Sequence, residues 1–267
     1  MHSTGVPKAS RDLIWEVFFR SRHRGVSLEV HFPWINDRII THCLSVDGDA
    51  VNGQKTSLAS LVLKAIQSAA GEWFGLVGLV CVAPQSRGNG LSSKLVSSAI
   101  EVGHTLGWKG LMLWTRSPEI YAGQGFSIEN QELFGSVEGI QTASSDRSIK
   151  TQSWPTEKDC SLQRGLPPFA SVATQYVRDG ASVIVLQTPL GPTVAEWDGP
   201  AILVANILTE TMPGRWFLNA RTGDSIVGAL SEQNFRCELG PANCQMVKTL
   251  SGSIRPEWPK IRFLDRI

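Results

Sequence analysis

A glycine-rich loop between an apolar strand and a helix is the segment of this 267-residue chain best suited to chemistry. Residues 85–90 read QSRGNG, and Leu91 then opens a helical apolar pattern. The first backbone N–H groups of a helix have no partner within it and carry the positive end of the helix dipole. Such groups bind anions, phosphates above all. Gly88 and Gly90 would let a phosphate approach the backbone, because neither has a Cβ.

Two other phosphate-binding patterns do not fit the loop. It lacks the Lys-Ser/Thr pair of a P-loop, and it lacks the third glycine and the spacing of a dinucleotide fingerprint. The elements around the loop must therefore indicate which ligand it serves.

The loop lies within an alternation of strands and helices. Residues 75–82 (GLVGLVCV) are small and apolar, which is typical of a strand buried on both faces. An amphipathic helix is predicted over Leu91–Val102, a strand over Gly110–Trp114 and a short helix over Pro118–Gln124. This order predicts a βαβα unit with parallel strands. Before it, the sequence predicts a helix over about 10–20 and a hairpin of strands 39–46 and 58–63, with a turn signal at 47–49.

A second motif stands about thirty-five residues after the loop, where residues 121–126 read YAGQGF. The loop matches the pyrophosphate-loop pattern Q/R-x-x-G-x-G/A of GCN5-related N-acetyltransferases, and residues 121–126 match that family's second pattern, Tyr-x-x-x-Gly-Phe. The helix and strand between the motifs also agree. Residues of about 10–135 therefore resemble the GCN5-related N-acetyltransferase (GNAT) superfamily, which implies an α/β fold with a mixed central sheet.

The resemblance implies an acyl-coenzyme A, usually acetyl-CoA, as the anionic ligand and co-substrate, with no metal ion. The pyrophosphate would lie on N–H groups of the loop, and the pantetheine arm would pair with the strand backbone. One of these strand N–H groups would polarise the thioester carbonyl. Ser117 stands where the family often has asparagine, and it would hydrogen-bond the pantetheine. The implied donor-site residues are Val80, Val82, Arg87, Gly88, Asn89, Gly90, Leu91, Ser92 and Ser117.

Two catalytic roles follow from the same resemblance. Tyr121 would be the general acid that protonates the departing CoA thiolate, since a phenol and an alkyl thiol have pKa values within about two units. The acceptor is an ammonium with a pKa of about 10, so it must lose a proton before attack. Glu72 is the carboxylate nearest to the strand, because residues 74–82 contain no acid. His31 and His42 are the titratable alternatives, and a water chain without a dedicated base stays open.

The expected function is that of an enzyme, an acyl-CoA-dependent N-acyltransferase. It would transfer an acetyl group from acetyl-CoA to a primary amine of a small molecule or peptide by direct attack. Two alternatives stay open. The donor could be a longer acyl-CoA or a carrier-protein acyl group, or the chain could be a non-catalytic CoA-binding sensor or assembly subunit. The absence of an obvious base favours a sensor, whereas Tyr121 favours an enzyme.

The second half repeats the order of elements without the chemistry. Only residues 198–200 separate its predicted strand 193–197 from a helix, and Asp198 would repel a phosphate. Leu230 stands where the tyrosine of the second motif would be expected. We expect a GNAT acetyltransferase domain at 1–135, a polar linker or long loop at 136–168, and a smaller degenerate GNAT-like half at 169–267. Its remaining predicted elements are helices at 201–208 and 225–232 and strands at 216–220, 235–239 and 245–250.

Composition and charge bound the classes of partner. Hydrophobic residues make up 42% and charged residues 18%, as in an ordinary folded domain. The formal net charge of +1 offers no electrostatic footprint for nucleic acid or for an anionic membrane. No apolar run reaches the roughly 18–20 residues of a membrane span. Five cysteines without a signal-peptide pattern indicate a reducing compartment, so we expect a cytoplasmic protein. The oligomeric state is not predicted.

Overall fold

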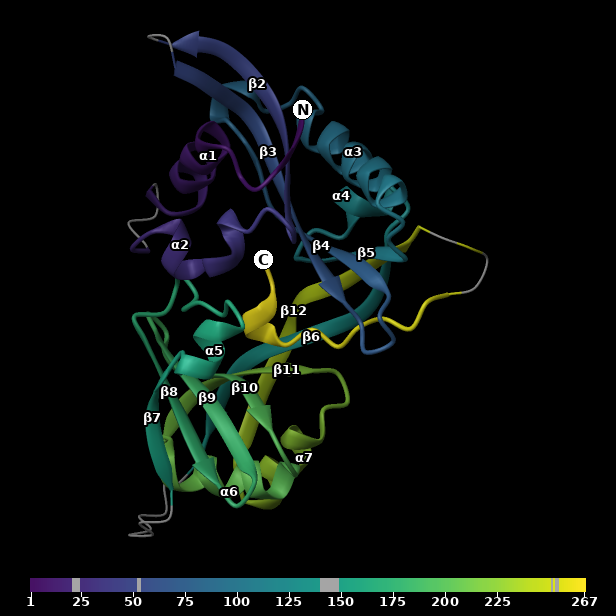
Figure 1. Cartoon of the computed structure of the whole chain (residues 1–267). Coiled ribbons are helices and arrows are strands. Elements are labelled where there is room, and N and C mark those ends of the chain that lie inside the picture. The colour runs from purple at the N-terminus through teal and green to yellow at the C-terminus, as the bar shows by residue number, and fades with distance from the viewer. Residues whose placement is uncertain (21–24, 52–53, 140–148, 251, 253–254) are drawn as a thin grey trace. The chain divides into compact units, whose positions relative to one another are not determined.

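The computed structural model describes residues 1–20, 25–51, 54–139, 149–250, 252 and 255–267. The chain forms two compact units, each a mixed α/β structure (Figure 1). Unit 1 contains Met1–Glu129, Gln245–Ile261 and Asp265–Ile267, and unit 2 contains Asn130–Cys244 and Arg262–Leu264. The predicted α/β fold class is therefore confirmed. No helix among the described residues is both long and apolar enough to cross a membrane.

The sheet of unit 1 is built on a long antiparallel hairpin of β2 and β3. Strand β1 pairs antiparallel with β2, β4 pairs antiparallel with β3, and β5 pairs parallel with β4. The part of β12 that belongs to unit 1 lies next to β5. The strands are β1 (His2–Thr4), β2 (Thr41–Val51), β3 (Gln54–Gln67), β4 (Trp73–Val82), β5 (Gly110–Thr115) and β12 (Arg236–Thr249).

Helices cover both faces of this sheet. Helices α1 (Lys8–Phe18) and α2 (Leu28–His31) lie on one face, and α3 (Leu91–Thr105) lies on the other (Figure 1). Their apolar residues recur at helical spacing, so α1 buries Leu13 and Ile14, while α3 buries the row Leu95, Val96 and Ala99. A short helix, α4 (Glu119–Ala122), follows β5. The predicted strand, helix, strand, helix order around the glycine loop is confirmed.

Unit 2 has two apolar layers because successive side chains along a strand point to opposite faces of the sheet. On β9, Val183 and Val185 pack into one cluster with Trp216 and helices α6 and α7, while Ile184 and Leu186 pack on the other face. The strand order is β6-β11-β10-β9-β8-β7. The elements are β6 (Ser127–Glu138), β7 (Lys150–Trp154), α5 (Glu157–Ser161), β8 (Val172–Arg178), β9 (Ala181–Thr188), β10 (Gly191–Asp198), α6 (Ala201–Thr211), β11 (Arg215–Arg221) and α7 (Ser225–Glu232).

Three features of the structure differ from the sequence-based expectations. The segment 136–168 is not simply a linker, because its described part holds the end of β6, all of β7 and α5. The two strands expected at 235–239 and 245–250 are one continuous strand, β12, which contributes to both units. The turn signal at 47–49 lies inside β2, where the ladder with β3 shifts register, so it marks an irregular strand and not the hairpin turn.

Candidate functional site

Strand β4 carries a β-bulge near its end. Ser60 of β3 faces Cys81 and Val62 faces Gly78, so the single residue between them on β3 opposes both Leu79 and Val80. Leu79 has a φ of +48°, which is rare for a bulky side chain and costs on the order of 1–3 kcal/mol. Strain of this kind persists only where the surrounding structure enforces it, and it gathers at functional sites.

Strands β4 and β5 also diverge shortly before this bulge. Their described parallel ladder runs only from Phe74 opposite Gly110 to Leu76 opposite Met112. Beyond Leu76, β4 continues to Val82 without ladder partners on β5. Backbone donors and acceptors on that side of β4 are therefore available to a ligand.

The glycine loop follows directly. After a single 3₁₀ turn over Pro84–Ser86, Gly88 and Gly90 adopt φ values of +81° and +67°. A Cβ built on either glycine would meet nothing within 4 Å, so both face open space. Gly90 is the N-cap of the 15-residue helix α3 and has no side chain to cap the first N–H groups. The Asn89 side chain braces the loop by donating to the Ser86 carbonyl at 3.2 Å.

The bulge, the loop and the start of α3 enclose one cavity of about 340 Å³. This volume lies within the range typical of ligand pockets. All of the predicted donor-site residues except Asn89 and Ser117 line it. Val17 and Phe18 of α1 also line the cavity, and nothing in their helical spacing distinguishes them from core residues. The lining residues are Val17, Phe18, Val80, Cys81, Val82, Ser86, Arg87, Gly88, Gly90, Leu91 and Ser92.

Cys81 is the one thiol among the described residues that line this cavity. Its side chain belongs to the apolar cluster that includes Leu13 and Ile14 of α1, and the residue is only 4% exposed. Burial raises the pKa of the Cys81 thiol to about 12. At neutral pH the sulfur is therefore protonated, and a protonated thiol is a poor nucleophile.

Tyr121 lies in α4 and is partly buried, with its ring edge-on to Phe126 at a centroid distance of 6.1 Å. Burial raises the pKa of the phenol above its usual value of about 10, so the hydroxyl keeps its proton at neutral pH. Gly125 closes the turn after α4 with a φ of +81°. Neither Tyr121 nor Ser117 is among the residues that line the cavity. Ser117 lies between β5 and α4, where its N–H donates to Thr115 Oγ1 at 3.0 Å.

The structure does not bring Glu72 to the cavity. This carboxylate precedes β4 and lies eight residues before Val80, which is about 26 Å along a strand. It faces Lys109, with 3.5 Å between Nζ and Oε1. Glu72 is therefore too far from this cavity to act there directly as a base.

The two histidine alternatives have structural surroundings. His31 is buried, its Nε2 accepts a hydrogen bond from the Val26 N–H at 2.9 Å, and its ring stacks on Phe19. His42 lies 3.2 Å from His2, measured between Nδ1 and Nε2, and its ring is also near Trp108. In the part of the chain that the structure describes, no aspartate, glutamate or histidine lines the cavity.

Unit 2 repeats the strand arrangement found around this cavity, with a bulged strand and a short parallel ladder. Val194 faces Val185 and Glu196 faces Ile184, so Ala195 is an extra residue in β10. The described parallel ladder between β10 and β11 has two pairs, and α6 begins directly after Pro200. The glycine loop of unit 1 has no counterpart here. Leu230, in the place of the tyrosine, is fully buried.

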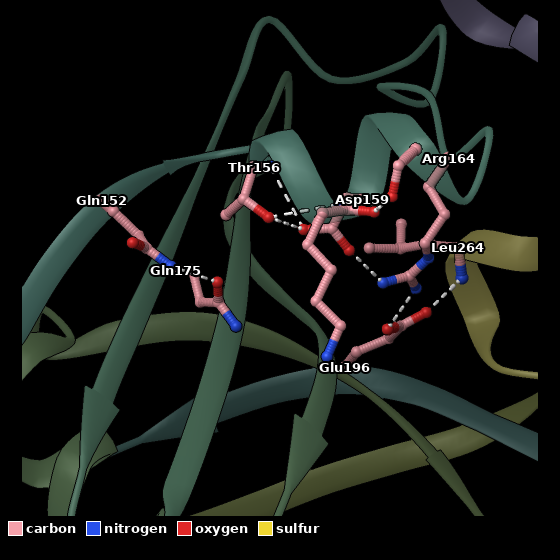
Figure 2. A network of polar contacts seen from close by, with 9 residues as sticks. Gln152, Thr156, Asp159, Arg164, Gln175, Glu196 and Leu264 are labelled. Carbon is pink, nitrogen blue, oxygen red and sulfur yellow. Dashed lines mark hydrogen bonds and ion pairs between the residues drawn. The ribbon is translucent and has the colours of Figure 1, made fainter.

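A polar network occupies the region beside this second bulge. Figure 2 shows the Glu196 carboxylate between the guanidinium of Arg164 and the backbone nitrogen of Leu264, which donate to it at 2.7 and 2.5 Å. Arg164 also donates to Asp159 at 2.8 Å, and its guanidinium lies over the Trp154 ring. Burial by itself would raise the pKa of Asp159, but hydrogen bonds from Thr156 and Arg164 outweigh it and hold the pKa below its usual value.

Comparisons with known proteins address the fold. No model of a protein family matches the chain, and no curated protein matches it. Among solved structures, a GCN5-related N-acetyltransferase from Kribbella flavida aligns with a TM-score of 0.61 and 13% identity, covering 94% of this chain and 71% of that one. One from Anabaena variabilis ATCC 29413 has a TM-score of 0.61, 10% identity and coverages of 94% and 73%. A conserved protein from Enterococcus faecalis V583 has a TM-score of 0.64, 12% identity and coverages of 91% and 70%. The chain has the GCN5-related N-acetyltransferase fold.

The GNAT fold confirms the resemblance predicted from the QSRGNG loop and the YAGQGF segment. Within this GNAT fold, the bulge of β4 and the divergence of β4 from β5 were not predicted from the sequence. The roles of the individual residues in donor binding and catalysis stay predictions. Among the described residues, no group of three or more histidine, cysteine, aspartate or glutamate side chains is placed to hold a metal ion.

Proposed function

We propose that this protein transfers an acyl group, acetyl in the first instance, from an acyl-CoA to a primary amine. The observation that carries the proposal is that one cavity joins the bulged backbone of β4 to the open N-terminus of α3. A CoA thioester has the matching chemistry, with an anionic pyrophosphate at one end and an amide-bearing arm leading to the thioester.

In this proposal the pyrophosphate lies on the N–H groups at the start of α3. Gly88 and Gly90 leave room for it, and the helix dipole favours its charge. The pantetheine arm then runs along β4 past Val82 to Val80, using backbone groups that β5 leaves unpaired. Because those groups belong to the backbone, the apolar side chains at these positions are no obstacle.

The amine attacks the thioester carbonyl directly. A backbone N–H of the bulged strand stabilises the oxyanion that forms, and the C–S bond then breaks. Tyr121 donates its proton to the thiolate that leaves. Direct attack is favoured over an acyl-cysteine intermediate, because Cys81 is held as a thiol by its raised pKa. No acid or histidine lines the described cavity, so water is proposed to take the proton of the ammonium.

Calorimetric titration with acetyl-CoA tests the donor site. The wild-type protein is expected to bind one equivalent. Gly90→Glu places a carboxylate at the start of α3, where it repels the phosphates, and we expect affinity to fall by more than about a hundredfold.

Gly107→Glu is the matched control. Gly107 follows α3 at its other end, has a φ of +70° and has no atom within 4 Å of a built Cβ, as at Gly90. Both substitutions thus impose a similar backbone cost, but only the one at Gly90 lies in the cavity. Circular dichroism checks that both variants fold. Equal loss of binding in the two variants, or no binding by the wild-type protein, would contradict the proposal.

A non-catalytic CoA-binding protein is the second candidate. The absence of an acid or a histidine from the described lining of the cavity favours it. A screen of amines with release of free CoA thiol as the readout separates the two candidates. Saturable binding of acetyl-CoA without thiol release from any amine class would favour the sensor.

A further inference from the structure

Ile267 lies against β4 at the point where this strand leaves β5. A Cβ built on Gly78 would approach Ile267 Cγ1 to 2.3 Å and the backbone carbonyl carbon and oxygen of Ile267 to 2.6 Å each. Ile267 can therefore lie this close to β4 only because residue 78 is a glycine. Both residues belong to unit 1.

The contacts of Ile267 reach both diverging strands. It packs against the apolar cluster that contains Leu76 of β4 and Met112 of β5, which form the last pair of the described ladder. It also packs against the cluster that contains Cys81 and includes Leu79 of the bulge at its margin. Ile267 thus lies over the face of β4 at Gly78, just beyond the last described pair of the ladder with β5.

Ile267 lies beyond one end of the cavity, against the strand that lines it. The cavity is lined by β4 from Val82 back to Val80, and the next residues in that direction are Leu79 and Gly78. Ile267 is not itself among the lining residues, but it covers Gly78, two residues before Val80. A ligand that follows β4 from the loop and extends past Val80 toward Gly78 would therefore meet Ile267.

We propose that Ile267 sets the length of the acyl chain and restricts the donor to short acyl-CoA thioesters. This inference rests on the proposed function, in which the pantetheine arm runs from the loop to Val80. The acyl group lies beyond the thioester, on the side of Gly78. An acetyl group needs little space there, whereas each further methylene of a longer chain has to displace Ile267. Ile267 is then a specificity-determining residue that takes no part in proton transfer.

Affinities of CoA, acetyl-CoA and butyryl-CoA for the wild-type protein and for Ile267→Ala test the proposal. In the wild-type protein, butyryl-CoA is expected to bind no more tightly than acetyl-CoA. In Ile267→Ala, two further methylenes can be buried, and each contributes about fourfold in affinity. The ratio of butyryl-CoA to acetyl-CoA affinity is therefore expected to rise about fifteenfold. Ile267→Val, which removes one methyl group and is the milder change for folding, is expected to raise the ratio by up to about fourfold.

Ile261→Ala is the matched control, since Ile261 is a buried member of the same apolar cluster. It should leave the ratio unchanged. A ratio that stays constant in Ile267→Ala while CoA and acetyl-CoA still bind would overturn the proposal, and so would equal shifts in the two alanine variants. If no CoA species binds to the wild-type protein, the proposed function itself fails and this inference fails with it.

Discussion

Arg164 and Glu196 form a buried ion pair, with 2.7 Å between Nη2 and Oε2 and only 7% of each side chain exposed. Removal of one partner leaves the other charge buried, which typically costs 3–5 kcal/mol. Because Asp159 still faces Arg164, we expect Glu196→Ala to lower the free energy of unfolding by about 3 kcal/mol. Denaturant titration measures this loss.

The exposed pair of Lys8 and Asp12 provides the control for that experiment. Nζ and Oδ2 are 2.6 Å apart, but the side chains are 75% and 62% exposed. Lys8→Ala is therefore expected to change the free energy of unfolding by less than about 0.5 kcal/mol. If the two substitutions cost the same, burial is not what makes the Arg164–Glu196 pair important.

Replacement of Tyr121 by phenylalanine tests its role as general acid. We expect Tyr121→Phe to lower kcat by about 10²–10⁴ with little change in KM for acetyl-CoA, because the ring still packs while the proton donor is lost. Tyr176→Phe is the control, since Tyr176 is the second of the two tyrosines and lies in β8 of unit 2. An unchanged kcat in Tyr121→Phe would assign the phenol a packing role.

The raised pKa of Tyr121 also makes a prediction about alkaline pH. A general acid must be protonated, and burial moves the pKa of this phenol above about 10. At pH values below 10, deprotonation of Tyr121 is therefore not expected to reduce activity. A fall near pH 8 that disappears in Tyr121→Phe would contradict this assignment.

Cys81 is expected to be chemically inert. Because burial raises its pKa to about 12, iodoacetamide should not label it in the folded protein up to pH 9. The exposed thiol of Cys160 should react under the same conditions and serves as the internal control. Cys81→Ala should keep acyl transfer within a few fold, whereas complete loss of activity with intact acetyl-CoA binding would favour an acyl-cysteine intermediate. Mass spectrometry of peptides identifies the labelled residue.

The pair of His2 and His42 predicts weaker stability in acid. Burial lowers the pKa of both imidazoles, the nearby N-terminal charge lowers that of His2 further, and His2 lowers that of His42 further. As pH falls below the unfolded value of about 6.5, the unfolded chain takes up protons first, so stability decreases. The midpoint of thermal unfolding should therefore drop less between pH 7.5 and pH 5 in His42→Gln than in the wild-type protein. His104→Gln, at an exposed position on α3, should show the same drop in the unfolding midpoint as the wild-type protein.

The parts of the fold that could be predicted depend on local patterns. The apolar run before the loop, the glycines and the helical spacing after Leu91 lie within about thirty consecutive residues, and they predicted β4, the loop and α3. They also predicted most of the cavity lining. The two halves were recognised through the repeated order of their elements. Asn234 precedes Phe235 as Gly125 precedes Phe126, and both Asn234 and Gly125 have a positive φ.

The remaining features depend on contacts between distant residues. The bulge at Leu79 depends on the register between β4 and β3, and the residue type at this position does not predict it. The approach of Ile267 to Gly78 joins residues 189 positions apart, so no spacing rule could find it. Strand β7 escaped prediction because the side chains of 150–153 are exposed and polar, and Trp154 alone is buried.

The membership of β12 in unit 1 has a consequence for synthesis on the ribosome. Strand β5 ends at Thr115, but its neighbour in the sheet, the last part of β12, is not made until Thr249. At about 5–20 residues per second, translation of the residues between them takes on the order of ten seconds. Throughout that interval the nascent first half exposes an unpaired sheet edge, a ready template for pairing with another chain. Unit 1 of this protein is thus completed late, and the period before β12 emerges is when the chain most needs protection from aggregation.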